Sequence, residues 1–338
     1  MRVGYNPHKD QTIEKTDYIH QVIIPVFIPN LEGYFKESLA VLQLSLQSLF
    51  QTIHSKTFVT IVNNGCCDEV KDYLQQLFDK HKIHEIIHTN NIGKLNAIVK
   101  GLAGTNFELV TVSDADVLFL KDWQSETISI FKQISKVGVV GIVPQFNLHK
   151  VNATNVVLDN LLHPKMKFVP VKNEDALSKF YDSIGWDKNY NHDYLKFSLG
   201  LQWNADLMVL VGSGHFVATY KRNIFDTISN FNPYKMGSYS EDCLDSLPLQ
   251  NDYWRVTTHD NYAYHIGNSI ESWMLEIQAT FENKEENTIK YGFKKHKQLS
   301  KINFLFRIKI PQYIFKKKFV YRAFLKWKKL PTYMIKNY

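Results

Sequence analysis

The sequence has few cysteines and no long apolar run. Its 338 residues include three cysteines, Cys66, Cys67 and Cys243, which are odd in number and lack metal-ligand spacing. This excludes a disulfide framework and predicts reduced thiols, with a vicinal redox pair at Cys66 and Cys67 as the alternative. No segment approaches the roughly 18 apolar residues that cross a bilayer.

The first residues lack the apolar centre of a secretory signal peptide. They read MRVGYNPHKDQTIEK, which is polar and mixed in charge. From this we expect the protein to stay in the cytoplasm, where it is made.

Acidic residues are missing from the end of the chain. Residues 291–338 contain 14 Lys and Arg and no Asp or Glu, whereas residues 1–290 contain 26 Lys and Arg against 33 Asp and Glu. The body is therefore about −7 and the end +14, which gives the net charge of +7. Because the basic charge belongs to the end, nucleic acid is not the expected partner of the body.

Apolar and amphipathic segments alternate through the first 120 residues. The composition is globular, with 44% hydrophobic and 22% charged residues. Strands are expected at 21–29, 57–62, 83–87 and 107–112, and helices at 34–53, 67–80 and 94–102. This alternation predicts an α/β fold with a mostly parallel sheet and helices on both faces. Ligands of such sheets bind beyond the carboxyl ends of the strands, here the loops at 25–30, 63–68, 90–94 and 113–117.

The later part of the body is less regular. Residues 145–200 are polar and without a clear period, which predicts an insertion or a loop over the site. Residues 205–220 predict a strand, a turn around two glycines and a second strand. EDCLDSLPL (241–249) predicts a helix, 253–258 a strand, and 259–268 a short loop or strand end.

Two aspartates follow one apolar strand in the stretch VTVSDADVLFL (110–120). Aspartate is poor in strands and costly to bury. Side chains alternate along a strand, so Asp114 and Asp116 would face the same side and repel each other unless a cation lies near them. Carboxylate oxygens suit Mg²⁺ or Mn²⁺, which in turn bind diphosphates. Alone, this short and common motif more often marks a solvated loop with two unrelated aspartates.

The aspartate motif is one of seven segments that carry a resemblance to a known family. They are IIPVF (23–27), IVNNGCCD (61–68), NNIGKLNAIVKGL (90–102), SDADVLF (113–119), GSGHFVATYKRNIFD (212–226), SEDCLDSL (240–247) and YWRVTTHDNYAYHIGN (253–268). In this order they resemble the segments of the family-2-type inverting glycosyltransferases, which have the GT-A fold. The similarity runs by motif through most of residues 20–268.

The resemblance implies a site for a nucleotide-diphosphate sugar and a divalent ion, Mn²⁺ or Mg²⁺. The implied donor-site residues are Pro25, Asn63, Asn64, Lys94, Asn96, Asp114, Asp116 and Gly214. The implied metal ligands are Asp114, Asp116 and His265. Asp242 is the implied catalytic base, and Glu241 orients the acceptor or favours the helix N-terminus.

One position departs from the family pattern. Asn63-Asn64 stands where the family often has a pair containing Asp, which commonly accepts a hydrogen bond from uracil. An amide oxygen accepts the same bond without the assistance of a charge, so UDP is not specified as the donor nucleotide. His215 is equally compatible with a structural and a site role.

Three other functions share parts of this pattern. A retaining GT-A enzyme would use the same nucleotide and metal sites without Asp242 as base. A catalytically silent subunit of a glycan-assembly complex would keep the fold alone. A nucleotidyltransferase is less consistent, because no Gly-rich N-terminal loop with a following Arg is present.

Residues 291–338 interleave lysines with aromatic residues. We expect a GT-A domain over 1–290, with a nucleotide half at about 20–120 and an acceptor half at about 200–270. We expect the basic segment to form an amphipathic helix from about Tyr313, bracketed by Pro311 and Pro331. Such a helix suits an anionic membrane surface; packing on the domain and RNA binding are the alternatives.

A peripheral position at the inner face of the cell membrane would fit a lipid-linked glycan acceptor. The resemblance implies bacterial surface polysaccharide synthesis. The sugar, the linkage and the oligomeric state are not specified by the sequence.

Overall fold

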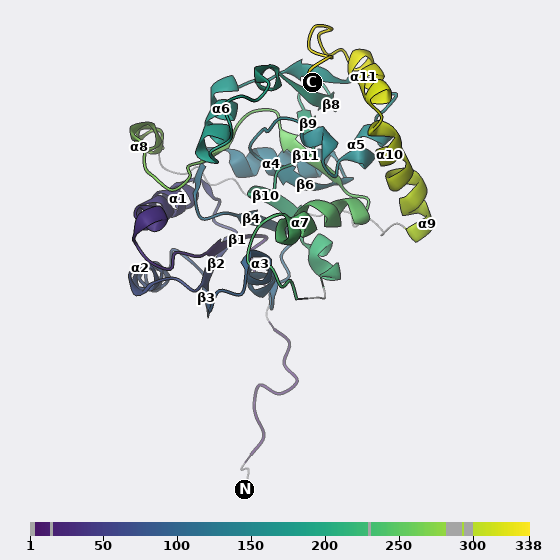
Figure 1. Ribbon diagram of the computed structural model, residues 1–338. Helices are drawn as coiled ribbons and strands as arrows, with labels where there is room; N and C mark the ends of the chain where they lie inside the picture. Colours follow the sequence, from purple (N-terminus) through teal and green to yellow (C-terminus); the bar gives the residue numbers. More distant parts are fainter. Residues whose placement is uncertain (1–3, 14–15, 229–230, 282–292, 294–299) are drawn as a thin grey trace.

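The first half of the chain alternates strands and helices as predicted (Figure 1). The computed structural model describes residues 4–13, 16–228, 231–281, 293 and 300–338. The strands are β1 (His20–Val26), β2 (Thr57–Asn64), β3 (Glu85–Thr89) and β4 (Leu109–Ser113). The helices between them are α1 (Ser38–Thr52), α2 (Asp68–Asp79) and α3 (Lys94–Leu102).

These strands belong to a ten-stranded sheet in the order β3-β2-β1-β4-β10-β6-β11-β9-β8-β7. The later members are β6 (Val137–Gly141), β7 (Met166–Pro170), β8 (Phe197–Gln202), β9 (Met208–Val211), β10 (Val217–Lys221) and β11 (Trp254–Thr258). β1 pairs in parallel with β2 and β4, and β6 pairs in parallel with β11. β10 runs antiparallel between β4 and β6. The predicted mostly parallel α/β sheet is therefore confirmed.

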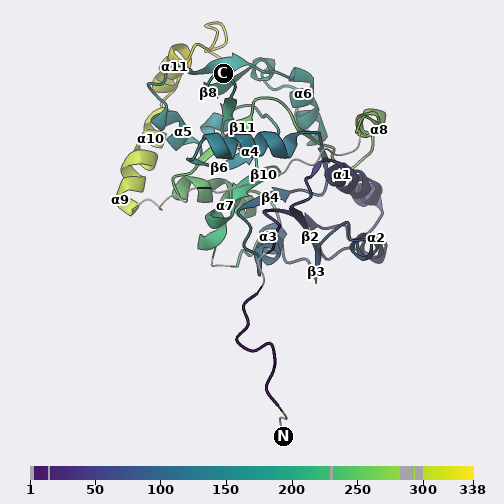
Figure 2. The same ribbon diagram turned by 180° about the vertical axis from the view of Figure 1, so that it is seen from behind.

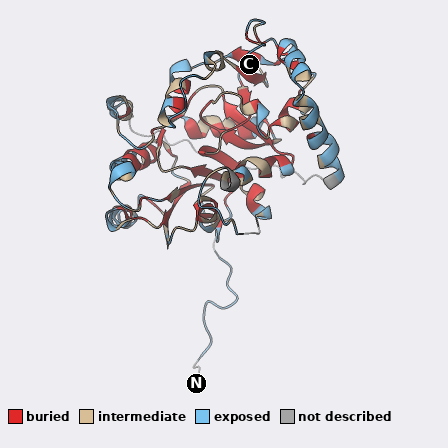
Figure 3. Ribbon diagram, in the orientation of Figure 1, coloured by how far each residue is buried: buried red, intermediate tan, exposed pale blue. Residues whose placement is uncertain are grey.

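Alternating side chains of β1 contribute to two separate cores, one on each face of the sheet. Val22 and Ile24 pack with leucines of α1, whereas Ile23 between them packs with Ile98 of α3. Because successive side chains point to opposite faces of a strand, α1 and α3 cover opposite faces of the sheet. Figure 3 shows the resulting buried centre, in which the strands are covered on both sides.

A two-stranded ribbon lies beside the main sheet. It is formed by β5 (Val117–Phe119) and β12 (Ala263–His265), which pair antiparallel. Its register places His265 opposite Val117, the residue after the second aspartate of the Asp-x-Asp motif. The ribbon therefore brings a histidine from late in the chain to that motif.

The remaining helices cover the sheet and its far end. They are α4 (Trp123–Gln133), α5 (Thr154–Asp159), α6 (Glu174–Ser183), α7 (Ser238–Gln250) and α8 (Ser272–Ala279). Within the described residues, 3₁₀ turns occur at Gly33–Phe35, Leu148–Lys150, His192–Leu195 and Arg222–Thr227. Figure 2, the view from behind, shows α4 in front of the sheet, on the side away from α3 and α7.

One expectation about the later body is wrong. Residues 145–200 are not an irregular insertion, because they contribute α5, α6 and the strands β7 and β8, which extend the main sheet. Residues 205–220 form the two predicted strands, β9 and β10, with Gly212 and Gly214 between them, although the two strands are not paired, since β6 and β11 lie between them. Short, half-polar strands carry little local periodicity, so β7 and β8 are not visible in the sequence.

The basic C-terminal segment is helical over a longer stretch than expected. It contains α9 (Lys301–Phe304), a π-helical turn (Leu305–Lys309), α10 (Ile310–Phe315) and α11 (Lys318–Trp327). Pro311 lies in the first turn of α10, which follows directly on the π-helical turn, so it lies within the helical stretch and does not open it as expected. The expected boundary at 290 lies outside the described residues. Across the described chain, no helix has both the length and the apolar content to span a bilayer.

Candidate active site

A cavity of about 420 Å³ opens at the carboxyl edge of the parallel strands. It is bounded by the end of β1, the first turns of α1, the end of β4 and the loop before α7. Its lining includes predicted site residues, namely Pro25, Asn64, Lys94, Asp114 and Asp116, together with Lys235 and Asn268. The cavity therefore lies where a parallel sheet binds ligands.

Lys94 joins two carboxylates at the floor of the cavity. Its ammonium Nζ lies 2.6 Å from Oδ1 of Asp114 and 3.0 Å from Oε1 of Glu241. Burial by itself lowers the pKa of Lys94, but the charges of Asp114 and Glu241 outweigh burial and raise it above its usual value. The lysine is therefore a permanent cation between the strand β4 and the helix α7.

His215 links the same glutamate to a second acidic residue of α7. Its Nδ1 lies 3.1 Å from Oδ2 of Asp245, and its Nε2 lies 3.5 Å from Oε2 of Glu241. Burial lowers the pKa of His215, but its hydrogen bonds to Asp245 and Glu241 prevail and raise the pKa to about 9. His215 is therefore positively charged at neutral pH.

Glu241 is held as a carboxylate by two cations. The hydrogen bond with His215 lowers its pKa most, burial opposes this, and Lys94 lowers it further, to about 2. The partner carboxylate Asp245 is held in turn by Arg255, a fully buried residue of β11 that also donates to the carbonyl oxygen of Ser213. A continuous chain of alternating charges thus leads from the sheet centre to Asp114.

Asp116 and His265 form the second charged pair of the site. Oδ2 of Asp116 lies 3.4 Å from Nε2 of His265, and the other ring nitrogen, Nδ1, lies 2.9 Å from Oγ of Ser183 on α6. The backbone N–H of Ile266 donates to the carbonyl oxygen of Asp116 at 2.9 Å. Burial raises the pKa of Asp116, His265 lowers it, and Asp114 raises it. The structure therefore brings together all three predicted metal ligands near one cavity.

These three residues do not form a closed ligand set. In the part of the chain that the structure describes, no three His, Cys, Asp or Glu side chains are grouped closely enough to hold a metal ion. Asp114 is turned to Lys94 instead. What remains is a carboxylate and an imidazole facing each other, a pair that needs ligands from a bound substrate to complete a coordination shell.

The two asparagines at the end of β2 have different surroundings. Oδ1 of Asn63 accepts from the backbone N–H of Cys66 at 2.9 Å, and its Nδ2 lies 2.8 Å from Nδ1 of His88. Oδ1 of Asn64 accepts from the N–H of Ile92 at 2.9 Å. Only Asn64 of the two lines the cavity. Both complete the end of β2, so the turn begins two residues later than predicted, at Gly65.

Asn96 and Gly93 hold the loop that precedes α7. Nδ2 of Asn96 donates to the carbonyl oxygen of Asn232 at 2.7 Å, and its Oδ1 accepts from the N–H of the same residue at 3.0 Å. Gly93 has a φ of 87°, and a Cβ there would come within 2.6 Å of the carbonyl oxygen of Tyr234. Glycine permits this close approach, which carries Lys235 to the cavity.

Gly214 and Asp242 do not line the cavity. A Cβ on Gly214 would meet the side chain of Gln145 at 2.3 Å, so this position is tightly packed. Asp242 is exposed on α7, and among the described residues no hydrogen bond or ion pair to its carboxylate is found. Glu241 and Asp245, four residues apart, share the half-buried face of that helix that meets Lys94 and His215.

Three site residues have no counterpart in the sequence prediction: Asp245, Arg255 and Lys235. Asp245 follows Glu241 at helical spacing, which could have placed the two on one face. Arg255 stands among apolar residues of a predicted strand, and a buried arginine always requires a carboxylate or carbonyl partner. Lys235 carries no sequence signal, because it reaches the cavity only through the loop held by Asn96.

An open, mostly parallel sheet with a charged cavity at its carboxyl edge defines a nucleotide-binding type of α/β protein. Residues 22–185 match the family model for glycosyl transferase family 2. This part of the chain is therefore a glycosyl transferase family 2 domain, with the GT-A fold expected from the motifs. No curated protein sequence matches the chain significantly.

Solved structures with a similar arrangement include two glycosyltransferase systems. The mannosyltransferase PcManGT from Pyrobaculum calidifontis, in complex with GDP-Man and Mn²⁺, is 15% identical; the match covers 72% of this chain and 54% of that chain, with a TM-score of 0.41. The present chain thus spans about half of that protein. TarS 1–349 of S. aureus in complex with UDP-GlcNAc is 14% identical, and 79% of this chain and 68% of that chain align with a TM-score of 0.43.

Proposed function

We propose that the protein is a metal-dependent, inverting glycosyltransferase that moves a sugar from a nucleotide-diphosphate sugar to a hydroxyl group. The observation that carries this proposal is the pair of Asp116 and His265, 3.4 Å apart beside the cavity, with Asp114 two residues away. A carboxylate oxygen and an imidazole nitrogen fit Mn²⁺, and the carboxylate also fits Mg²⁺. Oxygens of a diphosphate would supply the ligands that the protein lacks.

The charges around the cavity suit a diphosphate leaving group. A divalent ion held by Asp116 and His265 would neutralise the charge that develops on the departing nucleotide. Lys94 and Lys235 add two protein cations to the lining of the cavity. Lys94 also keeps Asp114 and Glu241 at fixed positions, so that the floor of the cavity is preorganised before a donor binds.

Asp242 is the proposed general base. The neighbouring Glu241 is a poor proton acceptor, because His215 and Lys94 hold its pKa at about 2. Asp242 lies at the next position of α7, exposed and without an ion pair among the described residues. Its carboxylate would accept the proton of an acceptor hydroxyl that attacks the anomeric carbon in line, and a single displacement inverts that centre.

The proposed acceptor is a glycan or a lipid-linked glycan of bacterial surface polysaccharide synthesis. We place the reaction in the cytoplasm, at the inner face of the cell membrane, with the basic segment 291–338 as the part that contacts lipid. The 14 cations and missing acids of this segment support an anionic partner. The acidic balance of residues 1–290 does not favour nucleic acid.

The test is a panel of nucleotide sugars assayed for thermal stabilisation of the protein with and without Mn²⁺. Binding to the native state raises the midpoint of unfolding by mass action. One donor should stabilise the protein only with the metal, and Asp116→Asn should remove that effect. The anomeric configuration of the product, measured by NMR, distinguishes inversion from retention. A protein that releases no nucleotide with any donor would be a silent subunit.

A further inference from the structure

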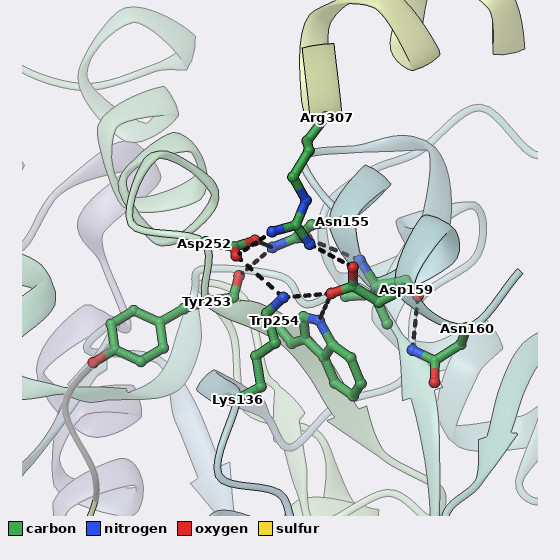
Figure 4. A network of polar contacts seen from close by, with 9 residues as sticks. Lys136, Asn155, Asp159, Asn160, Asp252, Tyr253, Trp254 and Arg307 are labelled. Atoms are coloured by element: carbon green, nitrogen blue, oxygen red, sulfur yellow. Dashed lines mark hydrogen bonds and ion pairs between the residues drawn. The ribbon is translucent and has the colours of Figure 1, made fainter. Parts of the chain in front are cut away.

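The basic C-terminal segment is fixed to the domain by a network of ion pairs (Figure 4). Arg307 Nη2 lies 2.6 Å from Oδ1 of Asp159, and its Nη1 lies 3.1 Å from Oδ2 of Asp252. Lys136 contacts the same two carboxylates at 2.5 and 3.1 Å, and the indole N–H of Trp254 donates to Asp159 at 2.8 Å. Two cations and two carboxylates therefore alternate where the segment meets α5 and β11.

Apolar contacts hold the segment along its length. Four of its buried side chains join the core that lies under α4 and α5, namely Phe324, Leu325, Leu330 and Met334, and Ile308 is buried as well. The backbone N–H of Phe168 in β7 donates to the carbonyl oxygen of Lys328 at 2.8 Å. One face of the segment therefore packs on the domain, which is one of the alternatives expected from the sequence.

The opposite face of the helical stretch 301–315 is also apolar. Ile302, Phe306, Ile310 and Tyr313 follow one another at spacings of three and four residues, and between 40% and 69% of each is exposed. Residues at this spacing form one stripe along a helix. A surface helix normally has polar residues on its outer side, so this second stripe has no role in folding the domain.

Cations flank this stripe and continue along α11. The exposed ones are Lys309, Lys316, Lys317, Lys318, Arg322, Lys326 and Lys329. Within the described residues none of these has a carboxylate partner, whereas Arg307 has two. Phe319, 76% exposed, and Trp327, 51% exposed, stand among them on α11. We call this combined surface of exposed apolar and basic side chains over 302–329 the outer face.

We propose that the outer face is a preformed binding surface for an anionic lipid bilayer. The inference deepens the membrane location given under the proposed function and rests on it. Aromatic and aliphatic side chains enter the headgroup region, while the neighbouring lysines contact phosphate groups. An acidic protein surface would satisfy the cations but not a long apolar stripe, so the two features together favour lipid.

The docking of the segment gives this surface a fixed orientation. Figures 1 and 2 agree that α9, α10 and α11 run along the side of the molecule away from α1, α2 and α8. Because the ion-pair network and the buried side chains hold the helices in place, binding does not require a disordered arm to fold. The nucleotide-binding half would therefore be kept away from the bilayer, open to the cytoplasm.

The first test removes charge from the outer face of the full-length protein. Lys316→Gln, Lys317→Gln and Lys318→Gln are combined, and sedimentation is measured with vesicles of phosphatidylcholine containing about one third phosphatidylglycerol. Since each cation contributes on the order of 1 kcal/mol near such a surface, the partition coefficient should fall about a hundredfold. The matched control changes Lys36, Lys80 and Lys82, which are exposed in the nucleotide half, and should bind as the unchanged protein does.

The second test removes apolar side chains without changing charge. Phe306→Ser with Phe319→Ser should weaken vesicle binding at least tenfold, and circular dichroism should show an unchanged fold because both side chains are exposed. If both sets of variants bind vesicles like the unchanged protein, or if the protein binds RNA and not vesicles, the inference is wrong. Nucleotide release from the donor without vesicles is measured in parallel. If the protein releases no nucleotide but still binds vesicles, the proposed transferase function is wrong, whereas the proposal for the outer face is supported.

Discussion

The ammonium of Lys94 lies between the carboxylates of Asp114 and Glu241, 2.6 Å from one and 3.0 Å from the other. Asp114 follows the central strand β4, and Glu241 lies on α7, more than a hundred residues later. The side chain of Lys94 is only 12% exposed, so its two ion pairs are poorly screened by water. This one lysine couples the predicted metal motif to the helix that carries the predicted base.

Lys94→Met should leave two carboxylates near each other without their cation. Removing one partner of a mostly buried ion pair costs about 3 kcal/mol. We expect a loss of that order in the free energy of unfolding, measured by urea denaturation. Lys71→Met is the control, because Lys71 pairs with Asp68 at an exposed site and should change the free energy of unfolding far less than Lys94→Met does. Equal effects of the two substitutions would contradict the role given to Lys94.

His215 should make stability depend on pH above neutrality. Its pKa is raised from 6.5 to about 9 in the folded protein, so its protonation stabilises the fold fully below the unfolded value. That contribution, about 2–3 kcal/mol, is lost as the pH rises from about 6.5 through 9. His215→Gln should flatten the profile in this window. The unfolding free energy of both proteins is measured by urea denaturation at several pH values. If it depends on pH in the same way for both, His215 is not held as a cation by Asp245 and Glu241.

Asp242→Asn should abolish transfer while the donor still binds. Loss of a general base lowers the rate by roughly 10²–10⁴-fold, whereas the nucleotide contacts are unaffected. The measurement compares single-turnover transfer with donor affinity from titration calorimetry. Glu241→Gln serves as the comparison, because it breaks the contacts to Lys94 and His215 and should reduce stability as well as rate. Near-normal turnover of Asp242→Asn would refute the assignment.

Arg307→Leu should weaken the attachment of the C-terminal segment. Asp159 and Asp252 would keep only Lys136 as a cationic partner, and we expect a loss of about 1 kcal/mol in unfolding free energy because Arg307 is partly exposed. Burial raises the pKa of Asp159, but Lys136, Trp254 and Arg307 lower it below its usual value. The stabilisation is therefore present above the unfolded pKa of the aspartate and disappears as the pH falls through its folded pKa. A loss of stability that persists unchanged at acidic pH would contradict this ion-pair role.

The regular part of the fold could be predicted because local and tertiary signals agree there. The helix α3 spans residues 94–102 as expected, since its apolar spacing matches the face that packs on β1 and β2. The strands β7 and β8 could not be predicted. Their sequences, MKFVP and FSLGLQ, are short and only partly apolar, and pairing at the edge of the sheet decides their conformation.

The site was predictable where a motif fixes both residue type and place. The motif order brings His265 to Asp116, and the register of β12 with β5 confirms that these residues lie together. The link from Arg255 through Asp245 to His215 was missed, because it depends on side chains from three elements that meet only in the folded protein. No spacing in the sequence encodes such a meeting.

The most direct test of the account is the position of manganese in crystals of the protein soaked with Mn²⁺ and the stabilising nucleotide sugar. Anomalous scattering should place one ion between the carboxylate of Asp116 and the imidazole of His265, in contact with the diphosphate. An ion elsewhere, or a donor bound in the cavity without any ion at this pair, would contradict the account.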